Sequence, residues 1–112
     1  MTTTIAYKVL TAEQWAALDA DTFDGAPVDQ ADGYIHLSTA AQVTETVDRH
    51  FRDQRELFIA AIDLATLGDA VRWERSRHGQ LFPHVYARLP RKSVIAACRL
   101  ERDASGAVRI PQ

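Results

Sequence analysis

Residues 32–38, with the sequence DGYIHLS, alternate polar and apolar side chains after a glycine turn. Successive side chains of a β-strand point to opposite faces, so Tyr34, His36 and Ser38 share one face. Ile35 and Leu37 share the other face, which is apolar and suits a protein core. The segment therefore predicts a short strand over residues 34–38, with one face in the core and a second face that carries a phenol, an imidazole and a hydroxyl.

A second segment repeats this pattern further along the chain. In residues 81–86 (LFPHVY), His84 and Tyr86 lie on one face of an extended chain and Val85 lies on the other. Two rows of His and Tyr in a small domain predict a polar cleft, since ligand sites combine shape with a few placed polar groups. The residues do not by themselves specify a reaction.

The length and charge of the chain limit its class. Its 112 residues are 46% hydrophobic and 25% charged, which is typical of a single globular domain with its own core. The net charge of −2 argues against tight nucleic-acid binding, which needs a dense basic surface. A local basic groove that attracts phosphates is still compatible with the sequence. Its members surround the second His/Tyr row and are Arg72, Arg75, Arg77, Arg88, Arg91 and Lys92.

The order of the expected elements indicates an α+β fold. Residues 11–14 (TAEQ) match a capping box at the start of a helix, and the unbroken apolar run at 57–62 predicts a central strand covered on both faces. Strands are expected at 5–10, 34–38, 57–62, 71–75, 85–87 and 94–101, helices at 11–19 and from 38 or 39 to about 52, a helical turn at 65–68, and loops at 20–33 and 76–83. Residues 108–110 are compatible with a hairpin.

Cys98 is the one cysteine, so no internal disulfide forms, as in a protein of a reducing compartment. It lies in the apolar run 94–98 and is expected to be a buried hydrophobic side chain rather than a nucleophile. No apolar run approaches the ~20 residues of a membrane span, and residues 1–4 lack the features of a secretory signal. These observations favour a cytoplasmic protein without a membrane partner.

The four histidines are the first candidates for chemistry. None has the spacing of a metal-binding motif, so no metal is expected. His50 falls on the predicted buried stripe of the second helix and is expected to be structural, while His78 lies in a loop and is expected to be solvated. His36 and His84 have two interpretations each. They are either half-buried side chains satisfied by backbone groups, or members of a cleft in which a tyrosine flanks each of them.

Glu74 is a further candidate, on the strand expected at 71–75. Its carboxylate is either a general base or ribose-hydroxyl acceptor, or else the ion-pair partner of a nearby arginine, which is the commoner role of a charge on a strand surface. The chain contains no GxSxG elbow, phosphate loop or GxGxxG string. A hydrolase triad and a Rossmann cofactor site are therefore unsupported.

Three strings taken together resemble the bacterial domain-of-unknown-function family 952 over nearly the whole chain: residues 32–38, Trp73-Glu74, and residues 82–86 (FPHVY). In that family the last string usually continues with Gly and Pro, where this chain has Ala87-Arg88. The family is similar to the ADP-ribosyltransferase superfold, and its closest resemblance there is to the RNA 2′-phosphotransferases. Those enzymes also carry a His-Leu-Ser string and an apolar strand that ends in Asp, here Ile62-Asp63.

The resemblance implies a single α+β domain with an ADP-ribosyltransferase-like split β-sheet and two main helices. It also implies a cleft for NAD, ADP-ribose or a related nucleotide, with NAD as the cofactor and ADP-ribosyl or phosphoryl transfer as the reaction. The ligand-binding residues would be Tyr34, His36, Ser38 and Tyr86, and the catalytic residues would be His36, Glu74 and His84. In such a site His36 and Ser38 would hold the nicotinamide-side ribose or the phosphate.

One difference from the phosphotransferases favours another function. Those enzymes carry His-Gly-Thr after the tyrosine of their first strand, whereas Tyr7 is followed here by Lys8, Val9 and Leu10. Only glycine allows so close an approach of backbone to a dinucleotide. The alternative is a non-catalytic ligand-binding or protein-interaction module in which both His/Tyr rows are structural.

Overall fold

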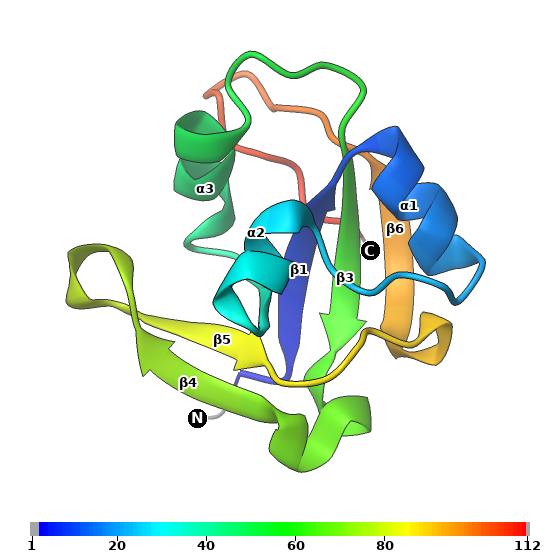
Figure 1. Ribbon diagram of the computed structural model, residues 1–112. Helices are drawn as coiled ribbons and strands as arrows, with labels where there is room; N and C mark the ends of the chain where they lie inside the picture. The colour runs from blue at the N-terminus through cyan, green and yellow to red at the C-terminus, as the bar shows by residue number, and fades with distance from the viewer. Residues whose placement is uncertain (1–2, 112) are drawn as a thin grey trace.

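Two three-stranded antiparallel sheets form the framework of the molecule (Figure 1). The structure is a computed structural model that describes residues 3–111. The strands are β1 Ile5–Leu10, β2 Ile35–His36, β3 Phe58–Asp63, β4 Val71–Arg75, β5 Leu81–Val85 and β6 Val94–Arg99, and the α-helices are α1 Ala12–Asp19, α2 Pro27–Asp32 and α3 Val43–His50. Short 3-10 helices cover Leu64–Ala70, Arg77–Gly79 and Arg91–Ser93. The α+β class predicted from the sequence is confirmed.

The first sheet has the strand order β1-β3-β6, with the apolar strand β3 in its centre. Because β3 is covered on both faces, its side chains divide between two cores. Ala60 and Ile62 pack with α1 and the second sheet, while Ile59 and Ala61 pack with α3. This is the arrangement that an unbroken apolar run predicts.

The second sheet has the order β2-β5-β4, and it carries the alternating segments. Ile35, Leu37 and Val85 are buried and join the core on the α1 side. The two sheets meet where Tyr7 of β1 and Ser38 exchange backbone hydrogen bonds of 2.7 and 2.9 Å. The polar face of the second sheet therefore lies next to β1.

The Gly- and Pro-bearing segment expected as a loop at 20–33 contains a helix, α2, so the prediction of two main helices was incomplete. Pro27 lies in the first turn, where its missing N–H costs nothing. Asp29 caps the helix by accepting a 2.8 Å hydrogen bond from the backbone N–H of Ala26. Gly33 ends it with φ of 86°, a left-handed conformation that favours glycine. Turn residues in this segment act as helix caps.

Several boundaries differ from those expected. The capping box of Thr11 and Gln14 is present at α1, but α3 begins at Val43 rather than at 38 or 39, because Ser38 still pairs with Tyr7. β2 spans two residues instead of 34–38, and β5 begins at 81, within the loop expected at 76–83. β6 ends at residue 99, and the expected hairpin at 108–110 is one bridge between Arg102 and Val108.

The prediction that Cys98 is buried was wrong, since its side chain is exposed. Free cysteines in apolar runs are usually buried, but β6 lies at the edge of its sheet, so this run does not bring Cys98 into the core. Ile95 on the same strand is also exposed, at 52%. Within residues 3–111, no helix has the length and apolar character needed to cross a membrane.

Candidate functional site

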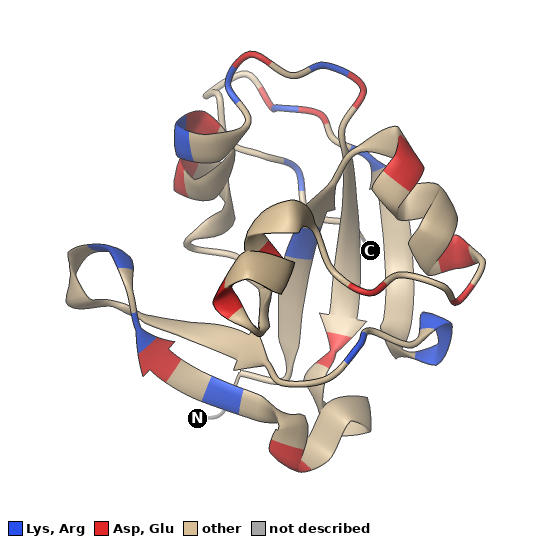
Figure 2. Ribbon diagram, in the orientation of Figure 1, with Lys and Arg blue, Asp and Glu red and all other residues tan. Residues whose placement is uncertain are grey.

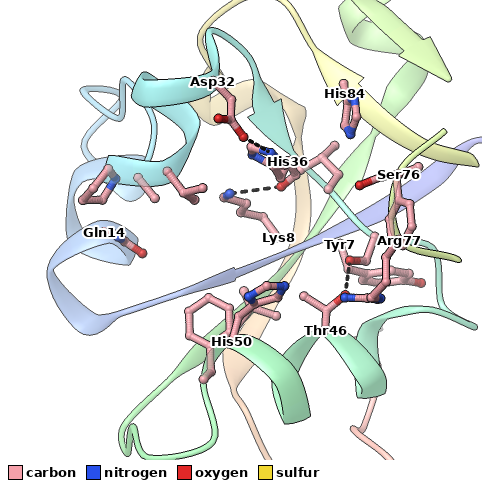
Figure 3. Close-up of a pocket in the computed structure, with 18 of the residues that line it drawn as sticks. Tyr7, Lys8, Gln14, Asp32, His36, Thr46, His50, Ser76, Arg77 and His84 are labelled. Atoms are coloured by element: carbon pink, nitrogen blue, oxygen red, sulfur yellow. Dashed lines mark hydrogen bonds and ion pairs between the residues drawn. The ribbon is translucent and has the colours of Figure 1, made fainter. Parts of the chain in front are cut away.

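A cavity of about 660 Å³ opens between β1, α2, α3 and the β4–β5 hairpin. Figure 3 shows His36, Asp32 and His84 on one side of it and Thr46 and His50 on the other. Its polar lining residues are Tyr7, Lys8, Thr11, Gln14, Asp32, His36, Ser38, Thr46, His50, Gln54, Ser76, Arg77 and His84. Apolar side chains, among them Val9, Leu37, Phe51 and Phe82, complete the wall. Cavities of this size and mixed character are typical of small-molecule sites.

The register of the second sheet brings the two His/Tyr rows together. His36 of β2 lies directly opposite His84 of β5, with ring centroids 5.4 Å apart. The Tyr34 ring stacks on His84 at 4.1 Å and lies 4.7 Å from the ring of His36. Tyr86 is 5.3 Å from Tyr34. All four rings form one cluster on the polar face of the sheet.

Glu74 organises one half of this cluster from β4. Its Oε1 accepts hydrogen bonds from Nδ1 of His84 at 2.8 Å and from the hydroxyl of Tyr86 at 2.7 Å. The bond from His84, followed by that from Tyr86, lowers the pKa of Glu74, and the same carboxylate raises the pKa of Tyr86. The partner of Glu74 is thus a histidine, where the sequence favoured an arginine.

His84 is 3% exposed, and its Nδ1 is held by Glu74. A carboxylate only accepts hydrogen bonds, so Nδ1 carries the proton and Nε2 of the neutral ring is a free acceptor. His84 lines the cavity, and no hydrogen-bond partner of Nε2 is found among residues 3–111. Figure 3 shows the ring directed toward the cavity. A basic nitrogen oriented by a carboxylate therefore faces the space where a ligand would lie.

Asp29 of α2 organises the other half of this cluster, and no sequence pattern singled it out. Its side chain is 1% exposed and accepts hydrogen bonds from Lys8 Nζ at 2.8 Å, from His36 Nδ1 at 2.7 Å, and from the backbone N–H groups of Ala26 and His36 at 2.8 and 3.0 Å. Burial raises the pKa of Asp29, but the His36 bond and the charge and bond of Lys8 outweigh it, so the pKa falls to about 2. Asp29 is therefore a buried, ionised carboxylate that holds the cavity residues Lys8 and His36 in place.

His36 lies between two carboxylates. Its Nδ1 donates to Asp29, and its Nε2 is 3.0 Å from Oδ2 of Asp32. The ionised carboxylate of Asp29 only accepts hydrogen bonds, so Nδ1 of His36 carries a proton. The contact between Nε2 and Asp32 is attractive only when a second proton lies between these two groups. The polar atoms of His36 are thus already engaged within the protein, unlike Nε2 of His84.

Thr46, Arg77 and His50, which were not predicted as site residues, line the cavity together with the predicted ligand-binding residue Ser38. Ser38 Oγ lies 2.9 Å from Thr46 Oγ1, which also accepts a 3.1 Å hydrogen bond from Nη2 of Arg77. His50 was expected to be a buried structural residue, but it is exposed at the end of α3 and lines the cavity. The partial burial of the His50 ring, and after it the charge of Arg77, lower the pKa of His50. Val43 and Val47 of the predicted stripe are buried, but His50 is the last residue of α3 and lines the cavity instead of packing in the core.

The residues chosen from the sequence therefore divide into two sets. His36, Ser38 and His84 line the cavity. Tyr34, Glu74 and Tyr86 are not in the lining. Tyr34 and Glu74 contact His84, and Tyr86 contacts Tyr34 and Glu74. The residues that the sequence did not single out for this site are Lys8, Asp29, Asp32, Thr46, His50 and Arg77, the last named earlier only as one of six basic residues.

The six basic residues that the sequence allowed to form a groove are separated in the structure. Arg72 lies over the ring of Tyr86, at 4.9 Å, and Arg77 enters the cavity. Arg88 instead pairs with Asp21, which follows α1, and Arg91 Nε lies 2.9 Å from Asp19, the last residue of α1. Figure 2 shows basic and acidic positions interspersed over the ribbon. Of the six, Arg77 is the one that lines the cavity. Within residues 3–111 no cluster of His, Cys, Asp or Glu suited to a metal ion occurs.

Comparison with known proteins identifies relatives of unknown function. Residues 9–97 match the model of a family described as "Protein of unknown function (DUF952)". The crystal structure of protein CC0527 from Caulobacter crescentus is similar, with a TM-score of 0.84, 40% identity, and coverage of 95% of this chain and 94% of that one. The solution NMR structure of CC0527 has a TM-score of 0.77 and 40% identity, over 95% and 91% of the two chains. No curated protein matches the chain.

Proposed function

The chain belongs to the DUF952 family, and from this premise we propose that it binds a nucleotide of the NAD or ADP-ribose class, with His84 as an acid–base group. The observation that carries the proposal is the pairing of Glu74 with His84 beside the cavity. The carboxylate holds Nδ1 at 2.8 Å, and the ring lines a cavity of about 660 Å³. A histidine oriented in this way is a common general base.

The proposed chemistry follows from the free acceptor on His84. Nε2 takes the proton of an acceptor hydroxyl or water as the oxygen bonds to the reacting carbon of the sugar or to phosphorus. The leaving group departs with the electrons of the broken bond, and His84 then returns the proton to it or to solvent. Glu74 is a positioning residue here, because it fixes the tautomer and stabilises the positive charge that forms on the ring.

The lining supports a nucleotide as the ligand. Phe51 and Phe82 offer apolar surface for a base, while Ser38, Thr46 and Arg77 offer polar groups for a sugar and phosphate. The proposal includes an ADP-ribosyltransferase-like arrangement of the two sheets, for which the bridge from Tyr7 to Ser38 is the supporting feature. The cavity then corresponds to the nucleotide cleft of that fold.

A specific observation favours the non-catalytic alternative for part of the site. His36 already contacts Asp29 and Asp32, and Lys8 is held by Asp29 and the carbonyl of His36. Groups with satisfied partners have little left to offer a ligand. In this alternative the His36 row is structural and the cavity binds a ligand without transforming it.

Binding and turnover separate these functions. Isothermal titration of the wild type with NAD and ADP-ribose tests binding, and proton NMR of free nicotinamide after incubation with NAD tests cleavage of the glycosidic bond. We expect binding of at least one of the two nucleotides, and turnover that His84→Ala abolishes while ADP-ribose still binds. His78→Ala is the matched control, because His78 is exposed on the hairpin and outside the lining.

The outcomes are distinct. Binding without turnover supports the non-catalytic module. Absence of binding by both nucleotides at millimolar concentration, with the protein folded, contradicts the nucleotide proposal. Equal turnover in His84→Ala and the wild type contradicts the role of His84.

A further inference from the structure

We infer that Arg77, together with Ser38 and Thr46, forms the subsite for a phosphate group of the ligand, an inference that rests on the proposed nucleotide site. Arg77 lies in the turn of the β4–β5 hairpin, and Thr46 lies in α3. Ser38 follows β2 and pairs with Tyr7 of β1. Thr46 and Arg77 lie across the cavity from His36 (Figure 3), and Ser38 Oγ approaches Thr46 Oγ1 to 2.9 Å. The inference assigns the phosphate of the proposed nucleotide to this part of the cavity.

The guanidinium of Arg77 is buried with few of its hydrogen bonds made. Its side chain is 12% exposed, and Nη2 donates to Thr46 Oγ1 at 3.1 Å. Nε is buried and makes no hydrogen bond to the part of the chain that is described. Buried charged groups are normally paired, and an incompletely paired one carries a large desolvation cost. A guanidinium with unused donors beside a cavity is suited to an anion that accepts more than one hydrogen bond.

Glu45 does not accept a hydrogen bond from the unused donors of Arg77. Its Oε1 is 3.8 Å from Nε of Arg77, which is beyond hydrogen-bond length. The carboxylate is half-exposed and also lies near Arg49, at 3.8 Å, and His78, at 3.4 Å. One half-exposed carboxylate shared between Arg49 and Arg77 cannot neutralise both guanidinium groups.

The two hydroxyls can respond to an anion. Thr46 Oγ1 donates its one hydrogen to the carbonyl of Gln42 at 3.2 Å, and it accepts from Arg77. The hydrogen between Thr46 and Ser38 therefore belongs to Ser38. Rotation of the Ser38 hydroxyl would direct this hydrogen into the cavity, where it joins the free donors of Arg77.

The hairpin fixes the position of Arg77 relative to His84. The turn contains His78 with φ of 59°, and the guanidinium rests on the ring of Phe82, 5.0 Å from its centroid. Phe82 and His84 are two residues apart on β5 and point to the same face, a separation of about 7 Å along a strand. A phosphate at Arg77 and a sugar at His84 would thus be neighbouring parts of one nucleotide.

The test uses Arg77→Gln, with Arg75→Gln as the matched control, since Arg75 is on the same hairpin, exposed, and outside the lining. Isothermal titration with ADP-ribose is expected to show at least a tenfold loss of affinity in Arg77→Gln and less than a twofold change in Arg75→Gln. Circular dichroism shows whether each variant is folded. In parallel, nitrogen–proton NMR follows the Arg77 Nε–H signal of the wild type during titration with pyrophosphate, and a saturable shift is expected.

The outcomes distinguish this inference from the proposed function. Wild-type binding of ADP-ribose that Arg77→Gln leaves unchanged overturns the phosphate subsite and leaves the nucleotide proposal standing. A pyrophosphate-induced shift at Arg77 in a protein that binds neither NAD nor ADP-ribose supports the subsite and contradicts the nucleotide. If the wild type binds neither NAD nor ADP-ribose and pyrophosphate does not shift the Arg77 signal, both proposals fail.

Discussion

Replacement of Asp29 by Asn should be among the most destabilising single changes at the site. Asp29 is ionised and buried, and it accepts hydrogen bonds from Lys8, from both His36 donors and from Ala26. Lowering its pKa from 3.8 to about 2 corresponds to about 2 kcal/mol in favour of the ionised form. Asn also leaves the Lys8 ammonium buried and unpaired, and breaking a buried pair in this way costs about 3–5 kcal/mol. We expect a loss in that range.

Urea unfolding at pH 7 measures this cost, with Asp24→Asn as the control, because Asp24 is 75% exposed in the same segment. The sign of the pH dependence is also set. Since the pKa of Asp29 is lower in the folded chain than in the unfolded one, its contribution is complete above about pH 4 and is lost as the pH falls toward 2. Asp29→Asn should reduce the acid sensitivity of the wild type.

A double-mutant cycle isolates the pair. Lys8→Met removes the charge that Asp29→Asn leaves unpaired, so the double variant should lose less stability than the two single variants lose together. A cost below about 1 kcal/mol for Asp29→Asn would refute the assignment of Asp29 as the anchor. Strict additivity with Lys8→Met would refute the pairing.

Three further predictions follow from neighbouring contacts. Glu74→Gln should lower the pKa of Tyr86 toward its ordinary value, since the carboxylate that raises it is lost, and carbon NMR of the tyrosine ring reads this directly; an unchanged pKa contradicts the hydrogen bond. Gly33→Ala should cost about 1–2 kcal/mol in urea unfolding, because φ is 86° and a Cβ there meets no neighbour, so backbone strain alone acts; a neutral effect contradicts this reasoning. Arg77→Gln should raise the pKa of His50, because the charge of Arg77 is, after burial, the next cause of its lowered pKa. Proton NMR titration measures this pKa, and a lower value in the variant contradicts the prediction.

Local patterns predicted the parts of the fold that depend on neighbours in the sequence. The capping box at Thr11 and Gln14, the central strand near 57–62, and the shared polar face of Tyr34 and His36 all rest on one helical turn or on strand alternation. The pairing of His36 with His84 is consistent with two alternating segments, but the register comes from tertiary structure. From these features the sequence analysis predicted the cluster of His and Tyr residues at the candidate site.

The other half depends on contacts between distant segments. Lys8 and Asp29 are 21 residues apart, and a lysine within an apolar strand is the one signal that a buried acidic partner was needed. Arg77 and Thr46 are 31 residues apart and meet because the hairpin tip reaches α3. The burial of His50 and Cys98 was predicted wrongly because it depends on what packs against the end of a helix and on which strand lies at an edge. Neither property is encoded in local periodicity.

The most direct test of the nucleotide site is a titration of nitrogen-labelled protein with ADP-ribose, followed through the ring nitrogens of the four histidines. We predict a saturable shift at Nε2 of His84, a smaller one at His36, which Asp29 and Asp32 hold, and none at His78, which lies outside the lining. A His84 signal that does not move at millimolar ADP-ribose, in folded protein, would contradict the account.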